Sequence, residues 1–302
     1  MNDSVRVGAL HWRRNLSRAL TRENRASVRQ ILSDGARASG SAQRIGVTGP
    51  PGAGKSSLIA SLAKYRLQFN RTIGVLAIDP TSPISNGALL GDRIRMDAVA
   101  DDLRLFIRSV ASGSLHDGLC QNAIGMLDTM DTAGFDDIIL ETVGVGQVSY
   151  DARTLVDSLV LVLVPESGDT VQAMKAGILE MADVYVVNKA DLPNADRLNA
   201  ELRSVIRRGN STTTSMPAII NISTKGSMGI ADLSKAIDSH YASHRRTAKQ
   251  STGQFRRRHY QIRSLLSQHL EELISSEQIS GDMDDLRQTY AQMLKWMQGS
   301  AE

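Results

Sequence analysis

The chain has little of several residue types that mark other classes of protein. It contains a single cysteine, Cys120, in 302 residues, so no internal disulfide can form and a reducing compartment such as the cytoplasm is expected. Aromatic residues make up 4% of the chain, which predicts a core of aliphatic side chains. No apolar run approaches the roughly 20 residues that span a bilayer, so we expect no membrane association. The net charge of +3 is small and gives no reason to expect nucleic-acid binding.

The N-terminal segment, residues 1–43, is rich in arginine and poor in acids. Mitochondrial transit peptides share this composition. Apolar residues recur at helical spacing within the segment, however: Trp12, Leu16, Leu20, Val28, Ile31 and Leu32. This spacing predicts a pair of amphipathic helices. We therefore expect a retained helical extension in the cytoplasm, which a linker of small residues from Gly35 to Gln43 joins to the next unit.

Residues 44–245 alternate between short apolar, β-branched runs and helical stretches or loops. The apolar runs lie at 45–48, 73–78, 104–107, 137–140, 159–164, 184–187 and 218–222. The run 159–164 is apolar at every position, which is typical of a strand covered by helices on both faces. The pattern predicts an α/β domain with a doubly wound, mostly parallel sheet. Ligands are expected at the carboxyl ends of its strands.

The composition changes near residue 245, and residues 246–302 are expected to form a helical hairpin. The basic run Arg256–Arg258 is interpreted as the solvated start of its first helix. Apolar residues line one face of each helix: Ile262, Leu265, Leu266, Leu270, Leu273 and Ile274 on the first, and Leu286, Tyr290, Met293, Leu294 and Met297 on the second. These stripes are too apolar for a lone hairpin to hide, so we expect a homodimer through this arm.

A glycine-rich turn connects the first apolar run of this domain to a helix. The turn reads Gly49-Pro50-Pro51-Gly52-Ala53-Gly54-Lys55-Ser56-Ser57 and fits the spacing G-x-x-x-x-G-K-S. Its glycines allow backbone N–H groups to wrap a phosphate, and the helix adds its positive dipole end. Lys55 can neutralise the β/γ-phosphates, and the Ser56 hydroxyl can bind Mg²⁺. The turn predicts a site for a nucleoside triphosphate.

A second motif indicates which base this site accepts. Asn188, Lys189 and Asp191 follow the apolar run 184–187 directly. The Asp191 carboxylate can accept both N1–H and the exocyclic amino group of guanine, a donor pair that adenine lacks. Asn188 can hold the base edge, and the Lys189 stem can lie on its face. The combination predicts GTP and GDP as ligands.

Three acids at or beyond the ends of apolar runs are candidates for binding the γ-phosphate and its metal ion. Glu141 directly follows the run 137–140, and Gly144 comes three residues later. At this spacing the acid can reach Mg²⁺ through water, and the glycine N–H can meet the γ-phosphate. Asp79 ends the run 73–78, and Asp92 lies in the loop beyond it. Both are placed to bind the metal.

Longer motifs give the chain a close resemblance to a known family. They read Ala77-Ile78-Asp79-Pro80-Thr81-Ser82-Pro83, Leu90-Gly91-Asp92-Arg93-Ile94-Arg95-Met96, Glu141-Thr142-Val143-Gly144-Val145-Gly146-Gln147, and Gly168-Asp169 through Gln172 to Lys175-Ala176-Gly177. Together with the glycine-rich turn they resemble the MeaB/ArgK-type P-loop GTPases over roughly residues 15 to 245. Members of that family are chaperones of adenosylcobalamin-dependent acyl-CoA mutases, usually methylmalonyl-CoA mutase.

The resemblance implies roles for particular residues. It places Ser56, Asp79, Asp92 and Glu141 in the magnesium and phosphate shell. It makes Gln172 and Lys175 candidates for organising hydrolysis, within a mobile loop that couples the nucleotide to the client. The family's guanine-contacting Ser-Ala pair corresponds to Ser223 and Thr224. It also implies a C-terminal dimerisation arm. The segment Ser109–Gly118 differs from the family pattern and is assigned no catalytic role.

Two other functions share such a core. A metal-inserting chaperone GTPase of the nickel-delivery kind would need a soft or imidazole-rich site. His240 with His244, and His116 with Cys120, are spaced for one helix face, but neither pair has an evident third ligand. A transport-associated kinase is the other alternative. Stable phosphoprotein rather than free phosphate as the product from GTP would indicate the kinase.

Overall fold

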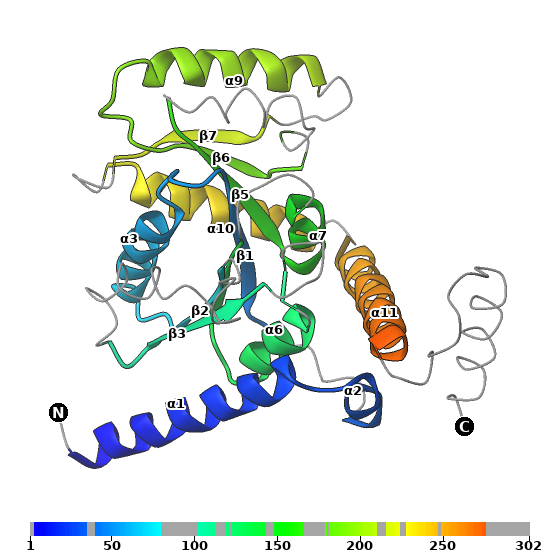
Figure 1. Cartoon of the computed structure of the whole chain (residues 1–302). Coiled ribbons are helices and arrows are strands. Elements are labelled where there is room, and N and C mark those ends of the chain that lie inside the picture. Colours follow the sequence, from blue (N-terminus) through cyan, green and yellow to red (C-terminus); the bar gives the residue numbers. More distant parts are fainter. Residues whose placement is uncertain are drawn as a thin grey trace, which may run out of the picture.

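The computed structural model describes residues 3–34, 40–79, 102–112, 119–120, 122–142, 148–165, 179, 181–209, 216–223, 228–246 and 249–275. Within them, seven strands form one parallel sheet in the order β3-β2-β4-β1-β5-β6-β7 (Figure 1). The strands are β1 Gln43–Thr48, β2 Ile73–Asp79, β3 Leu105–Ala111, β4 Asp137–Glu141, β5 Ser158–Leu163, β6 Val184–Val187 and β7 Ala218–Asn221. All seven expected strands are present, and the doubly wound parallel class is confirmed.

Helices cover both faces of this sheet. They are α1 Asp3–Asn24, α2 Val28–Asp34, α3 Lys55–Leu67, α6 Ala123–Thr132, α7 Val148–Leu155, α9 Ala195–Gly209, α10 Ile230–Arg246 and α11 Lys249–Ser275. Strand β5 shows how the two faces divide. Val160 and Val162 pack in the cluster with α3 and α10, whereas Leu159 and Leu161 pack in the clusters of the opposite face. Because side chains alternate along a strand, a run that is apolar throughout serves both layers.

The N-terminal helix α1 packs on the sheet domain and on α6. Leu16 and Leu20 are buried in the same cluster as the apolar face of α6. The Trp12 ring meets Phe106 and Phe135 edge-on, at centroid distances of 6.2 Å and 5.5 Å. The expected pair of amphipathic helices is therefore present. The stripe on α2 is weaker than expected, because Val28 is buried but Leu32 is 66% exposed.

Two local expectations differ from the structure. The linker expected to end at Gln43 ends earlier, since Gln43 already belongs to β1. The basic run Arg256–Arg258 lies inside α11 rather than at its start, and Arg257 forms an ion pair with Asp157. On α11, Ile262 and Leu266 of the expected apolar stripe are exposed, which leaves the expectation of a dimer contact through this arm open. Tyr260 and Gln268 turn inward and are buried.

The second helix expected in the arm, with its apolar stripe at 286–297, lies outside the described residues. Among the helices that the structure does describe, none combines the length and the apolar character needed to cross a membrane.

Candidate functional site

The glycine-rich turn lies at the carboxyl end of β1, between the ends of β4 and β5. Gly49 must be a glycine, because a Cβ there would lie 2.2 Å from the carbonyl oxygen of Val162 on β5. Gly54 has φ +83°, and a Cβ on it would lie 2.5 Å from Asn188 Nδ2. It is followed at once by α3, whose N-terminus therefore opens onto the turn. The loop needs glycine because neighbouring atoms of β5 and Asn188 approach it closely and because Gly54 has a left-handed backbone conformation.

Lys55 is the first residue of α3, and its ammonium group lies over the turn. Its Nζ donates hydrogen bonds to the carbonyl oxygens of Gly49 (2.9 Å) and Pro50 (3.2 Å). Pro51, Gly52 and Ser57 are exposed beside it, while Ala53 is buried. The structure thus brings a cation and the backbone of the loop to one place, as the motif predicts.

Ser56 and Glu141 meet beside the turn, although 85 residues separate them. The Ser56 hydroxyl donates to Glu141 Oε1 at 2.9 Å, and both residues are buried. The sheet register explains the meeting, because Glu141 at the end of β4 lies opposite Val47 of β1 and Ala77 of β2. A hydroxyl and a carboxylate are oxygen ligands of the kind that Mg²⁺ prefers, so this pair fits a magnesium site.

Asp79 ends β2 on the neighbouring side. It lies two residues beyond the position opposite Glu141, at the same edge of the sheet, and it is 1% exposed. Its backbone carbonyl accepts a hydrogen bond from the Ser112 N–H at 2.8 Å. Carboxylates are seldom buried, so the presence of two of them, Asp79 and Glu141, at adjoining strand ends makes this edge a candidate functional site.

The motif after β6 is tied directly to the glycine-rich turn. Asn188 Nδ2 donates to the carbonyl oxygen of Ala53 at 2.7 Å, and Lys189 Nζ donates to that of Gly52 at 3.1 Å. Lys189 has φ +53°, in the left-handed region that non-glycine residues seldom adopt. The sequence predicted that Asn188 contacts the base edge. Its amide nitrogen holds the two motifs together, and its buried Oδ1 has no hydrogen-bond partner among the described atoms, so the contact with the base stays a prediction.

Asp191 is oriented by the residue expected to contact guanine. Ser223, just beyond β7, donates its hydroxyl to Asp191 Oδ1 at 2.8 Å. The Ala190 N–H donates to the Ile222 carbonyl oxygen at 2.9 Å, which fixes the two loops against each other. Ser223 therefore contacts the Asp191 carboxylate itself, which spacing alone does not reveal.

Some of the expected residues cannot be placed. Asp92, Gly144, Gln172, Lys175 and Thr224 lie outside the described residues. Two backbone contacts at this edge were not predicted from the sequence. The Ala53 carbonyl accepts the bond from Asn188. Thr142, 1% exposed, follows Glu141, and its N–H donates to the Val47 carbonyl oxygen at 3.2 Å. Backbone contacts such as these depend on strand register and leave no trace in residue type.

The described side chains do not form the soft metal site that the nickel alternative requires. His240 Nδ1 lies 2.8 Å from the Ser158 hydroxyl, and its Nε2 lies 3.2 Å from Asp183 Oδ1. Cys120 is buried with its sulfur 3.8 Å from the Met126 sulfur. In the part of the chain that the structure describes, no group of three or more His, Cys, Asp or Glu side chains is arranged to hold a metal ion.

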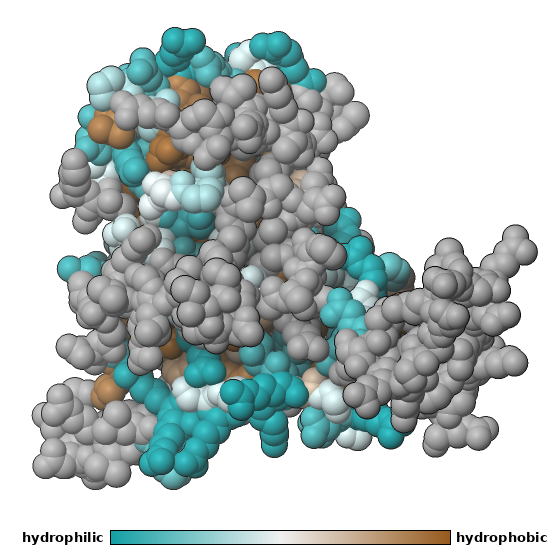
Figure 2. Space-filling model, viewed as in Figure 1, coloured by the Kyte–Doolittle hydropathy of each residue, from teal (hydrophilic) through white to brown (hydrophobic). Residues whose placement is uncertain are grey.

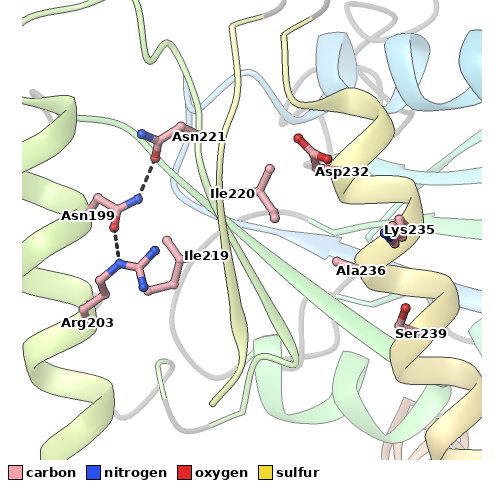
Figure 3. A pocket seen from close by; sticks show the side chains of 9 residues that line it. All are labelled: Asn199, Arg203, Ile219, Ile220, Asn221, Asp232, Lys235, Ala236 and Ser239. Atoms are coloured by element: carbon pink, nitrogen blue, oxygen red, sulfur yellow. Dashed lines mark hydrogen bonds between the residues drawn. The ribbon is translucent and has the colours of Figure 1, made fainter. Parts of the chain in front are cut away.

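An open groove of about 580 Å³ lies elsewhere on the molecule, along the edge strand β7 (Figure 3). Helices α9 and α10 form its walls, and the hydrogen-bonded chain from Arg203 through Asn199 to Asn221 lines one side. None of the residues that the sequence singled out for the nucleotide lines this groove. The candidate site is therefore the carboxyl edge of the sheet around the glycine-rich turn.

The sheet order, the turn at the end of β1 and the motif after β6 together define a P-loop GTPase fold. A solved structure described as a LAO/AO transport system kinase shares this fold, with a TM-score of 0.65 and 24% identity. The comparison covers 100% of this chain and 94% of that one.

The family follows from the sequence as a whole. The family described as methylmalonyl Co-A mutase-associated GTPase MeaB matches residues 16–280. The chain belongs to this family, which confirms the expected resemblance. A Pyrococcus abyssi protein that carries the name GTPase is 45% identical over 183 residues, 61% of this chain and 56% of that protein. The mouse mitochondrial methylmalonic aciduria type A homolog is 39% identical over 197 residues, 63% of this chain and 47% of that protein. The chain thus spans about half the length of these relatives.

Proposed function

We propose that this protein binds GTP with Mg²⁺ and hydrolyses it to GDP and phosphate. One observation carries the proposal: the hydrogen bond from Asn188 Nδ2 to the Ala53 carbonyl oxygen joins the phosphate-binding turn to the base-reading motif. The two halves of a guanine-nucleotide site thereby lie side by side. Family membership supports the same activity.

Each residue near the turn has a distinct proposed task. The ammonium group of Lys55 exchanges its bonds to Gly49 and Pro50 for bonds to phosphate oxygens. Ser56 and Glu141, with Asp79 and Asp92, hold Mg²⁺, which when bound neutralises the charge that develops on the transferred phosphoryl group. Gly144 is proposed to meet the γ-phosphate, and Gln172 and Lys175 to organise the attacking water. We expect slow intrinsic turnover, because the sequence offers no evident arginine finger in cis.

Base choice is the sharpest test of the nucleotide assignment. Asp191→Asn replaces an acceptor with an amide, so we expect weaker GTP binding and a gain for xanthosine triphosphate, whose C2 carbonyl can accept from that amide. The measurement is competition of GTP, ATP and xanthosine triphosphate for a fluorescent nucleotide analogue, with wild type and variant side by side. If ATP competes as well as GTP for the wild type, the guanine assignment is wrong.

We propose that the client is a cobalamin-dependent acyl-CoA mutase of the methylmalonyl-CoA type. The description of the family supports this partner. A client that binds the GTP form better than the GDP form must, by reciprocity, change nucleotide affinity. Steady-state GTP hydrolysis with and without purified mutase from the same source tests the proposal. Lys175→Ala should reduce the stimulation more than it reduces nucleotide binding. No stimulation, with equal mutase affinity in both nucleotide states, would remove the mutase as client.

We also propose that α11 forms a homodimer contact. Phe255, Ile262 and Leu266 are spaced for one helix face, and they are 70%, 51% and 48% exposed. Burying such a face against a second copy removes apolar area from water. Leu266→Glu, or truncation after about residue 250, should yield a monomer in light scattering. A monomeric wild type would contradict the proposal.

A further inference from the structure

A row of arginines runs along the solvent face of α1. It consists of Arg14, Arg18 and Arg22, with Arg25 just beyond the helix end, and all four are exposed. At 3.6 residues per turn and 1.5 Å per residue, the three positions in the helix fall within roughly 80° of its circumference and span about 12 Å. The part of the surface over α1 that Figure 2 colours, at the bottom of the view, is largely hydrophilic. We call this row the α1 arginine ridge.

The ridge has no acidic neighbour among the described residues. None of its four arginines forms an ion pair or a side-chain hydrogen bond there. The sequence explains why, since Glu23 is the only acid between residues 4 and 33. Glu23 itself is buried on the opposite side of the helix, where it accepts a hydrogen bond from Asn122.

The opposite face of α1 holds the ridge in a fixed position. Trp12 packs on Phe106 and Phe135, and Leu20 is fully buried. Arg13 Nη2 donates to the carbonyl oxygens of Asp102 and Leu105, both at 2.5 Å. This arginine, next to Arg14 in the sequence, shows how the chain uses an arginine to secure the fold. The ridge arginines make no such bond.

Like charges four residues apart destabilise a helix slightly. A row such as Arg14, Arg18 and Arg22 therefore lowers the stability of α1 unless a negative surface faces it. With a carboxylate partner, each guanidinium instead gains a short, charge-assisted and often bidentate hydrogen bond. The arrangement is suited to recognising an anionic surface.

A protein surface fits the ridge better than a membrane or a nucleic acid. A helix that lies in a membrane interface inserts its apolar face, but the apolar face of α1 is already packed against the domain. Recognition of single-stranded nucleic acid relies on exposed aromatic rings, whereas Trp12 contacts Phe106 and Phe135 inside the fold. Carboxylates spaced by one helical turn on a partner would match the spacing of the ridge.

We propose that the α1 arginine ridge is the docking surface for an acidic face of the client mutase. This inference rests on the proposed function and adds to it the part of the chain that the client touches. The ridge lies on the N-terminal extension, away from the turn and the base-reading motif. Charge at the ridge therefore controls client affinity without altering the nucleotide site.

The test is a pair of matched charge reversals in the full chain. Arg18→Glu/Arg22→Glu changes the ridge. Arg207→Glu/Arg208→Glu changes two exposed arginines in the last turn of α9 by the same charge. Affinity for purified mutase, in the presence of a non-hydrolysable GTP analogue, is measured by calorimetry at several salt concentrations. We expect the ridge variant to bind at least tenfold more weakly and to lose much of the salt dependence, and the α9 variant to bind as the wild type does.

Thermal unfolding and basal GTP hydrolysis check that the ridge variant is folded, and both should match the wild type. If it does not fold, Arg18→Gln/Arg22→Gln removes the charge without reversal and should still weaken binding. Equal mutase affinity in ridge variant and wild type overturns the docking assignment while leaving the client in place. No binding by the wild type overturns both proposals. A ridge-dependent affinity for phosphatidylserine vesicles or RNA, with mutase binding unchanged, assigns the ridge to another class of partner and also overturns it.

Discussion

The two edges of the sheet use buried polar groups in opposite ways. At the amino edge, Arg66 is 1% exposed and engages several partners: Asp137, Asp238, the Ser234 carbonyl and the Gln43 amide oxygen. At the carboxyl edge, Lys55, Asn188 and Lys189 each donate to backbone carbonyls of the glycine-rich turn. The first arrangement joins α3, α10 and two strands permanently. The second consists of bonds that a ligand can replace.

Burial makes the amino edge costly to disturb. Burial raises the pKa of Asp137, although Arg66 and Arg71 oppose the rise by stabilising its charged form. The carboxylate is fully buried, so its charge depends on those two guanidinium groups. Charges at this edge are structural, and we expect their loss to affect stability rather than activity.

Arg66→Met should therefore give the largest effect on stability. It leaves Asp137 buried with Arg71 as its remaining cationic partner, so we expect a loss of about 3–5 kcal/mol in the free energy of unfolding, measured by urea denaturation. Arg71→Met is the matched control. Arg71 contacts the same carboxylate, but its side chain is 32% exposed, so this substitution should lower the free energy of unfolding clearly less. Equal losses would break the distinction between buried and half-exposed partners. GTP affinity of the folded protein should be unchanged.

Lys55→Ala should produce the reverse pattern at the carboxyl edge. Removing the ammonium group should lower GTP hydrolysis at least hundredfold, about 2.7 kcal/mol in activation free energy, while unfolding stays close to wild type. Phosphate release measures the activity. Lys64→Ala, an exposed lysine on the same helix, controls for the loss of one charge on α3. Wild-type turnover in Lys55→Ala would contradict the P-loop assignment.

Ser223→Ala should have a smaller and more selective effect. The variant loses the hydrogen bond that orients the Asp191 carboxylate, so GTP affinity should fall about tenfold, or 1.4 kcal/mol. Affinity for ATP should not change, because adenine offers no donor pair to that carboxylate. Ser243→Ala, which loses a bond to the His240 carbonyl on the surface of α10, serves as control. A parallel loss for both nucleotides would show that Ser223 supports the loop rather than base choice.

The smallest effect is expected at Asp102, near the sheet edge where α1 is anchored. Hydrogen bonding from the Arg104 side chain lowers the pKa of Asp102 below its ordinary value of 3.8. Because the folded state favours the charged form, this contribution is present above pH 3.8 and is lost as pH falls through the lowered pKa. Asp102→Asn should be slightly less stable than wild type at pH 7, and the difference should vanish in strong acid. Thermal unfolding of both proteins across pH measures this difference. A difference that grows in acid would contradict the prediction that the folded state stabilises the charged form of Asp102.

Much of the fold could be predicted because it follows from local patterns. Each strand is a short apolar run, and all seven were located to within a few residues, including the start of β6 at Val184. The glycine-rich turn was recognisable because phosphate binding imposes both residue type and spacing. Contacts made by the backbone were not predictable in this way. The bond between Asn188 and Ala53 spans 135 residues, and it depends on where β1 and β6 end in the sheet.

The C-terminal helix α11 also makes contacts that local sequence patterns do not predict. The apolar positions of α11 predicted a helix with one apolar face, but they did not predict which side of the helix would pack on the domain. Tyr260 and Gln268 are buried there, while Ile262 and Leu266 face outward. Ion pairs of Arg257 with Asp157 and of Arg263 with Asp151 help to set this rotation. Both acids come from a distant part of the chain, so helical periodicity carried no information about them.

By itself, the sequence determined the class of fold, the glycine-rich turn and the motif at Asn188–Asp191, because each depends on residue types within a few positions. Only the tertiary structure decided that Ser56 meets Glu141, that Ser223 orients Asp191, and that Arg14, Arg18 and Arg22 face solvent without an acidic partner among the described residues. These relations arise from strand order and helix rotation. Packing of the whole core sets both, and no local stretch of sequence contains that information.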